Sequence, residues 1–324
     1  MITVQEAARL EEESRIILMS QIPDLLRRVG IYGTEAGKKL EGLFWRSLEA
    51  GLKKIGIGSC AGSVDSTPEG QELMDTLGQQ LVLPDSRLID GHHFEEALEF
   101  CRRGGNVLLV QNHTSGADVL ATYELLNRHF DDVVKGFWWM SGHVVNLYPI
   151  PLMLSSALNR FQIFSMKYRS LAAKQEETDE ETWMRAQNSR ALRAVIKVTI
   201  DGGKIVVLYP EGGRGEHGLI RGVAETMCIP EAMSAKREVM VLPTYVCNAT
   251  SVLPVVRTEN EFSEFLGYAT AGTVDLQIGK PYLWDTLQGM GKQSQADHIM
   301  STIAEMAPTD KLRGIYANGL IATH

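Results

Sequence analysis

The sequence lacks several features that mark particular classes of protein. Its four cysteines include no Cys-x-x-Cys pair, which argues against a zinc site and indicates reduced thiols in a cytosol-like compartment. Its longest apolar region, residues 137–161, is interrupted by His143, Pro149 and Pro151, whereas a membrane-spanning helix needs about 20 mostly apolar residues. The first residues are acidic rather than basic, so no secretory signal and no transmembrane segment are expected.

Basic residues are outnumbered as well. The chain has 32 Lys and Arg against 40 Asp and Glu, for a formal net charge of −8. General nucleic-acid binding depends on clustered cations that neutralise phosphates, so nucleic acid is excluded as a partner. A local basic pocket for one phosphate remains compatible with this charge. We expect a chain that is soluble or peripheral at a membrane, in the cytoplasm or, in a eukaryote, the plastid stroma.

The hydrophobicity pattern changes near residue 84. Residues 1–83 predict three or four helices without a strand between them, and this helical domain serves packing, substrate selection or partner docking. From residue 84, strands and helices alternate. The expected fold class is therefore α/β, with an N-terminal helical bundle (1–83) followed by a larger α/β domain (84–324) whose mixed, mostly parallel sheet is covered by helices. Strands are expected at 106–111, 135–140, 161–165, 204–209, 240–246 and 273–278, and helices at 34–54, 70–81, 94–103, 118–130, 149–158, 182–201 and 294–306.

A His-x4-Asp motif follows the first of these strands, where residues 112–118 read NHTSGAD. A carboxylate at Asp118, in the first turn of the next helix, can reach one imidazole nitrogen of His113 and leave the other nitrogen to accept a proton. Thr114 and Ser115 are candidate N-caps of that helix. A solvated loop histidine has the same spacing, so this motif indicates catalysis only in combination with a second one.

A glycine-rich loop follows the strand at 204–209, where residues 209–216 read YPEGGRGE. Gly212 and Gly213 permit a tight turn and a close approach of a ligand to the backbone. Arg214 offers a planar guanidinium suited to phosphate. The loop lacks the Lys-Ser/Thr pair of a nucleotide-binding P-loop, and alone it is equally compatible with a structural turn. Both motifs are expected at the carboxyl ends of strands, where ligands gather in α/β sheets.

Together the two motifs resemble the paired signature of the glycerolipid acyltransferases, in which an H-x4-D block is followed by an F-P-E-G-x-R block. Residues 160–168 resemble the block that precedes the phosphate-contacting residues, and residues 241–243 resemble the late apolar-Pro block. The helical N-terminal region, the Glu-Gly-Gly-Arg loop and residues 188–190 are similar to the soluble, plastid-type glycerol-3-phosphate 1-acyltransferases. The resemblance covers residues 90–285, approximately.

The resemblance implies a role for individual residues. His113 would be the general base and Asp118 its orienter, while Lys167 and Arg214 would hold the phosphate of the acceptor. The supporting positions of the two motifs are Asn112, Glu211, Gly212 and Gly213.

Two positions depart from the plastid-type pattern. Tyr168 stands where those enzymes carry a histidine, and Glu216 stands where they carry a second arginine. An acidic residue beside a bound dianion is unfavourable. Glu216 is therefore expected to point away, unless the acceptor differs. Arg221 or Arg169 are candidates for the missing charge.

The reaction that the resemblance implies is the first step of phospholipid biosynthesis. A fatty acyl group moves from an acyl carrier protein (ACP) or coenzyme A (CoA) thioester to the sn-1 hydroxyl of glycerol-3-phosphate, with no metal or other cofactor. Backbone N–H groups after His113 are expected to stabilise the oxyanion that develops as the hydroxyl attacks the thioester. Peripheral membrane contact is compatible with this chemistry. The alternatives are an acyltransferase for lysophosphatidate or another alcohol, and a non-catalytic acyl-carrier or lipid-binding protein. The intact His113 and Asp118 argue against the non-catalytic alternative.

Overall fold

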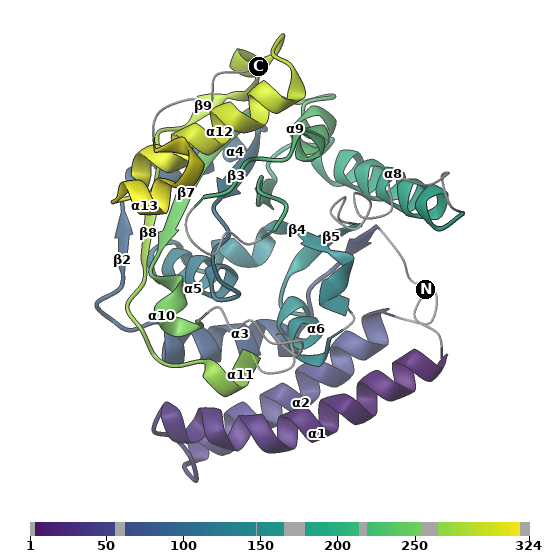
Figure 1. Ribbon diagram of the computed structural model, residues 1–324, viewed down its shortest axis with the longest axis vertical. Helices are drawn as coiled ribbons and strands as arrows, with labels where there is room; N and C mark the ends of the chain where they lie inside the picture. The colour runs from purple at the N-terminus through teal and green to yellow at the C-terminus, as the bar shows by residue number, and fades with distance from the viewer. Residues whose placement is uncertain are drawn as a thin grey trace.

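A computed structural model describes residues 4–55, 62–146, 148–164, 179–213, 219–254 and 265–317. Its centre is a nine-stranded mixed sheet with the strand order β1-β5-β4-β6-β3-β7-β8-β2, and β9 pairs with β7 (Figure 1). The central strands β5, β4, β6, β3 and β7 run parallel to one another. The mixed, mostly parallel sheet that the sequence predicts is therefore confirmed.

The buried central strands were predictable because they are short apolar runs between turn residues. Strand β3 begins and ends at the predicted residues, whereas β4 begins later because a 3-10 helix, Val133–Gly136, precedes it. The strands are β1 (Ser63–Val64), β2 (Arg87–Ile89), β3 (Asn106–Gln111), β4 (Trp138–Gly142), β5 (Asn159–Ile163), β6 (Ile205–Leu208), β7 (Val239–Cys247), β8 (Asp275–Ile278) and β9 (Tyr282–Leu283).

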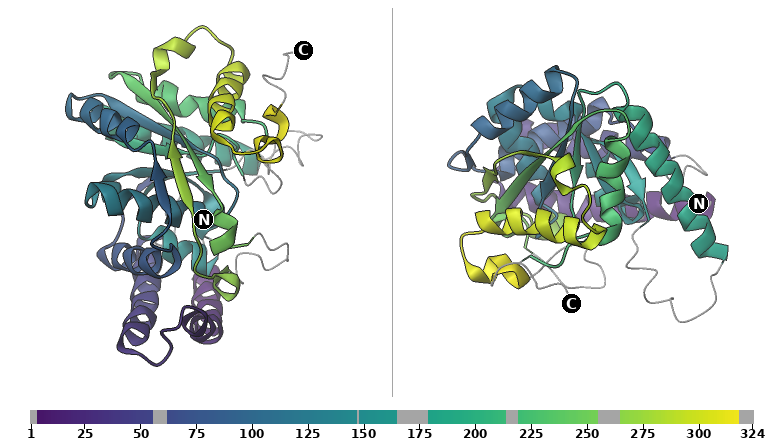
Figure 2. Two further views of the ribbon diagram at one scale, coloured as in Figure 1. Left: turned by 90° about the vertical axis from the view of Figure 1, so that its left-hand side faces the viewer. Right: turned by 90° about the horizontal axis from the view of Figure 1, so that it is seen from above.

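Helices cover both faces of the sheet, and each face has its own apolar core. One core joins the sheet to α2, α3, α4, α5 and α6, and the other joins it to α8, α9 and α12 (Figure 2). The helices are α1 (Val4–Arg28), α2 (Glu35–Ile55), α3 (Pro68–Leu81), α4 (His92–Arg102), α5 (Asp118–Phe130), α6 (Pro149–Ser155), α8 (Asp179–Thr199), α9 (Cys228–Met233), α10 (Ala249–Val252), α11 (Phe265–Tyr268), α12 (Lys292–Met306) and α13 (Asp310–Arg313).

The N-terminal helices share the first of these cores with the sheet. Helices α1 and α2 lie side by side along the bottom of Figure 1, and Leu25, Phe44 and Leu77 belong to the same buried cluster as Leu109 and Val207 of the sheet. Helix α3 begins at Pro68, two residues before the expected start at residue 70, and the Thr67 hydroxyl accepts a hydrogen bond from the backbone N–H of Gly70. The domain boundary at residues 83/84 stays a prediction.

The expectation of no strand before residue 84 is wrong. Strand β1 pairs antiparallel with β5 at the edge of the sheet. Two residues are too few to show the alternation by which a strand is recognised in a sequence. No helix among the described residues is long and apolar enough to cross a membrane.

Candidate active site

His113 lies just beyond the carboxyl end of β3, and its imidazole contacts the carboxylate of Asp118, the first residue of α5. The His113 Nδ1 and Asp118 Oδ2 atoms are 3.0 Å apart. The carboxylate is fully buried, whereas 23% of the His113 side chain is exposed. Such an acceptor favours the tautomer that carries its proton on Nδ1, which leaves the Nε2 lone pair to accept a proton. The geometry suits a general base, and that role of His113 stays a prediction.

The Asp118 carboxylate also organises the turn that carries His113. Its Oδ2 atom accepts hydrogen bonds from the backbone N–H groups of Thr114 at 2.7 Å and Ser115 at 2.9 Å. The N-cap position of α5 is Ala117 and not Thr114 or Ser115, the candidates from the sequence, although the Ser115 hydroxyl accepts the backbone N–H of Ala117 at 3.1 Å. The carboxylate of Asp118 binds the amides of Thr114 and Ser115 because it reaches back over the turn. Because the backbone N–H groups of Thr114 and Ser115 already donate to Asp118, they are not available to an oxyanion. The expectation that they stabilise the oxyanion is therefore wrong for these two residues.

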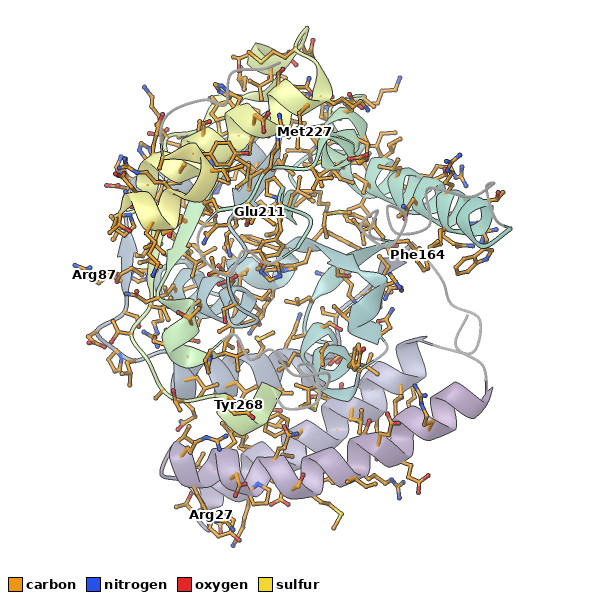
Figure 3. The ribbon with its side chains drawn as sticks, viewed as in Figure 1. Arg27, Arg87, Phe164, Glu211, Met227 and Tyr268 are labelled. Atoms are coloured by element: carbon orange, nitrogen blue, oxygen red, sulfur yellow. The ribbon has the colours of Figure 1, made fainter. Side chains whose placement is uncertain are left out.

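Glu211 joins the two sequence motifs. Its Oε2 atom accepts a hydrogen bond from the His113 backbone N–H at 2.6 Å, and its Oε1 atom accepts one from the Ile220 backbone N–H at 2.8 Å. The side chain is fully buried and lies in the interior of the molecule (Figure 3). One carboxylate thus fixes both the His113 turn and the far end of the glycine-rich loop. Charge-assisted bonds of this kind are stronger than neutral ones.

Asn112 fastens the same turn to the neighbouring strand. Its side-chain amide donates to the carbonyl of Val246 at 3.0 Å and accepts from the backbone N–H of Val246 at 2.7 Å, so it continues the pairing of β3 with β7. The Ser115 hydroxyl donates to the carbonyl of Leu253 at 2.7 Å. Hydrogen bonds from Asn112 and from Ser115 therefore attach the chain on both sides of His113 to the segment that contains Val246 and Leu253.

Tyr209, directly after β6, packs on the imidazole of His113 with the ring centroids 4.5 Å apart. Its hydroxyl is buried without a hydrogen-bond partner among the described residues. Burial, and then the charge of Asp118, raise the pKa of the Tyr209 phenol well above its usual value. The phenol is therefore neutral at physiological pH. Nothing in the sequence pattern singles out this hydroxyl, since the motif that the chain resembles carries phenylalanine at the same position.

The glycine-rich loop turns sharply after Tyr209. Gly212 has a φ of +61°, a backbone conformation that glycine adopts without a steric penalty. Its N–H donates to the Tyr209 carbonyl at 3.1 Å. Gly213 is described next to it, whereas the predicted phosphate-binding residues Lys167 and Arg214 lie outside the described residues.

Comparisons with known proteins find similarity over part of the chain. No protein-family model matches. The chloroplastic glycerol-3-phosphate acyltransferase of Spinacia oleracea is 24% identical over 129 residues, 40% of this chain and 26% of that protein. The protein of the same name from Arabidopsis thaliana is 25% identical over 121 residues, 37% of this chain and 25% of that protein. The chain thus spans about a quarter of the length of the curated relatives that it matches.

The two curated relatives support the resemblance of the chain to the glycerolipid acyltransferase superfamily. Among solved structures, the 1-acyl-sn-glycerophosphate (LPA) acyltransferase PlsC from Thermotoga maritima is similar at 14% sequence identity. That comparison has a TM-score of 0.42 and covers 95% of this chain and 100% of that chain.

Arg221 is one candidate for the positive charge that is missing at position 216, but its side chain binds Asp297. Its Nη2 and Nε atoms donate to the two carboxylate oxygens of Asp297 on α12, at 2.9 and 3.3 Å. Asp297 also accepts from Gln293 and Tyr316 at 3.1 Å each. Tyr316 in turn accepts the backbone N–H of Gly222 at 3.1 Å. The segment after the glycine-rich loop is therefore fastened to the C-terminal helices. The other candidate, Arg169, lies outside the described residues, as do Tyr168 and Glu216.

An Asp297→Asn variant tests this attachment through the pH dependence of stability. Burial acts to raise the pKa of Asp297, but the bonds from Arg221, Gln293 and Tyr316 outweigh it, and the pKa is lowered. The ionised carboxylate therefore stabilises the fold above its unfolded pKa of about 3.9, and this contribution is lost as the pH falls through the folded pKa. We expect the variant to lose about 1–3 kcal/mol of unfolding free energy at pH 7.

Urea unfolding at pH 7 and near pH 3 measures the effect. The difference between wild type and Asp297→Asn should be smaller at the lower pH, because a larger fraction of the wild-type carboxyl is protonated there than at pH 7. Asp285→Asn, at an exposed aspartate of the same region, should leave stability unchanged at pH 7. A difference of equal size at both pH values would show that the ionised form of Asp297 contributes nothing.

Proposed function

We propose that the protein transfers a fatty acyl group from an acyl-ACP or acyl-CoA thioester to the sn-1 hydroxyl of glycerol-3-phosphate. The observation that carries the proposal is the oriented pair of His113 and Asp118, held against the glycine-rich loop by Glu211. The similarity to two acyltransferases supports acyl transfer, and the names of these curated relatives support glycerol-3-phosphate as the acceptor.

The chemistry needs a base where the acceptor hydroxyl attacks the thioester. Nε2 of His113 takes the hydroxyl proton as the new C–O bond forms, and the buried Asp118 stabilises the resulting imidazolium. The thiolate of the donor leaves and takes this proton from the His113 imidazolium, which restores the neutral base. No covalent acyl-enzyme is required, because the thioester itself supplies the leaving group. Holding the acceptor in place lowers the barrier further, and we propose Lys167 and Arg214 for that task.

A second acceptor, in place of glycerol-3-phosphate, is also compatible with the site. Glu216 stands where the plastid-type enzymes carry a second arginine, and Arg221 is bound to Asp297 instead of standing free for a phosphate. A weaker phosphate clamp favours an acceptor that is bound mainly by apolar contacts. Lysophosphatidate, whose acyl chain offers such contacts, is the second candidate.

Thiol release from a palmitoyl thioester tests the proposal. We expect release by the wild-type protein only when an acceptor is present, with glycerol-3-phosphate more effective than lysophosphatidate. The reverse order would replace the acceptor but keep acyl transfer. Release without any acceptor would identify a thioesterase and contradict the proposal. A folded protein that releases no thiol with either acceptor or either donor would favour the non-catalytic alternative.

A further inference from the structure

Three polar atoms near the His113–Asp118 pair have hydrogen-bonding capacity that the described residues do not meet. The Tyr209 hydroxyl and the Gln111 Nε2 atom are buried and have no partner among these residues. In the same part of the chain, the Oδ1 atom of Asp118 accepts only the Thr114 hydroxyl, at 3.3 Å, whereas its Oδ2 atom contacts three donors. Buried polar groups almost always have a protein or water partner, because an unmet bond costs free energy.

The register of the sheet places Gln111 and Tyr209 side by side. Strands β3 and β6 are parallel and Val110 pairs with Leu208, so Gln111 and Tyr209 are the next two matching residues. Matching residues on neighbouring parallel strands point to the same face, and the strands are about 4.8 Å apart. That face is the one that α5 covers, since Tyr209 packs against its core and Gln111 Oε1 accepts the Thr122 hydroxyl of α5 at 2.8 Å.

Asp118 lies one helical turn from the same place. Thr122 follows it by four residues on α5, and side chains with this spacing are neighbours on a helix surface. The Tyr209 ring is held on the imidazole of His113, whose Nδ1 atom contacts Asp118. The pKa of the Tyr209 phenol is raised by burial and then by the charge of Asp118, which places the hydroxyl within the field of that carboxylate. The hydroxyl, the Gln111 amide and the carboxylate therefore surround one small polar site.

We propose that Tyr209 and Gln111 position Asp118 through one shared, buried water molecule. The inference rests on the proposed acyl transfer, in which Asp118 orients His113. The water accepts the Tyr209 O–H and one Gln111 N–H, and it donates to the Oδ1 atom of Asp118. Buried waters typically make about three hydrogen bonds of this kind. Both oxygens of the carboxylate are then held, Oδ2 by the His113 turn and Oδ1 by the water, so the carboxylate does not rotate away from the imidazole.

The hydroxyl separates this chain from the motif that it resembles, which carries phenylalanine at position 209. Tyr209→Phe removes the hydroxyl and keeps the ring that packs on His113. We expect kcat to fall about 10-fold while KM for donor and acceptor changes by less than a factor of about two, because a misplaced base affects the chemical step. A hydroxyl without a partner would give the opposite result, with kcat unchanged and the protein more stable in urea.

Two further variants make this result specific. Tyr282→Phe removes another buried hydroxyl that has no partner among the described residues, on β9 beside the amino-terminal half of β7, and it should retain wild-type kcat. Gln111→Met removes the second proposed partner of the water. If both residues act through the same water, Tyr209→Phe with Gln111→Met should lose no more kcat than the more damaging single change. Losses that multiply would overturn the shared water.

The water can also be tested without turnover, which separates this proposal from that of acyl transfer. A high-resolution crystal structure of the wild type should contain a water within about 2.7–3.2 Å of all three atoms, and Tyr209→Phe should lose it. The ¹H NMR signal of the proton between His113 Nδ1 and Asp118 should shift in Tyr209→Phe but not in Tyr282→Phe. Both results in a protein without acyltransferase activity would support the positioning site alone. A site without the water, or a signal that does not move, would overturn it.

Discussion

A His113→Ala variant should lose about 10²–10⁴-fold in kcat while it still binds the acyl donor, since removal of a general base has an effect of this size. His113 is held at its backbone by Glu211 and at its ring by Asp118 and Tyr209. Truncation of the ring leaves the backbone bond in place, so the loss should appear in the chemical step. Single-turnover kinetics with a saturating thioester donor measures that step separately from binding.

Two comparisons make the His113 result specific. His129→Ala, at the other end of α5, removes an imidazole that bonds only the carbonyl of Leu125 among the described residues, and it should retain wild-type kcat. Asp118→Asn should also lower kcat, because an amide no longer stabilises the imidazolium. A His113→Ala protein with full kcat and normal folding would contradict the role of His113 as the base.

A Glu211→Gln variant should lose both stability and activity, although the change replaces one atom. The carboxylate accepts one N–H at each oxygen, from His113 and from Ile220. Glutamine offers one oxygen and one NH2 group, so one backbone N–H would face another donor in a fully buried place. We expect a loss of about 1–3 kcal/mol in unfolding free energy. Displacement of His113 should lower kcat by about 10²-fold.

Amide hydrogen exchange locates this effect. The His113 or the Ile220 N–H should lose protection in Glu211→Gln, whereas amides in the centre of β3 should not. Glu238→Gln, at an exposed carboxylate next to β7, serves as the control and should leave exchange and kcat unchanged. Unchanged protection at both His113 and Ile220 would show that Glu211 does not hold the two loops together.

The parts of the fold that could be predicted from the sequence are those whose signal is local. Strand β3 and helix α5 have the predicted bounds because an apolar run, a polar turn and a helical repeat follow one another without ambiguity. The edge strands β1, β2 and β9 have two or three residues each. They are strands only because a neighbour supplies hydrogen bonds, and no sequence window contains that neighbour.

The same distinction applies to the candidate site. The contact between His113 and Asp118 was predictable because five residues separate them on a turn into a helix. Glu211 was recognised only as part of a motif, since its partner is a backbone N–H 98 residues earlier. The wrong assignment of Thr114 and Ser115 as helix caps has a similar cause. Capping statistics describe hydroxyls well, but here a buried carboxylate from the helix itself binds the amides.

The bonds of Glu211 also bear on how the loop can vary among relatives. Two of its partners are backbone groups, which every residue type except proline provides. The side chains at positions 113 and 220 can therefore change without loss of these two bonds, provided that the glutamate is kept. The link between the two motifs is thus written into a single side chain, at position 211, and a relative that keeps this residue keeps the means to join them.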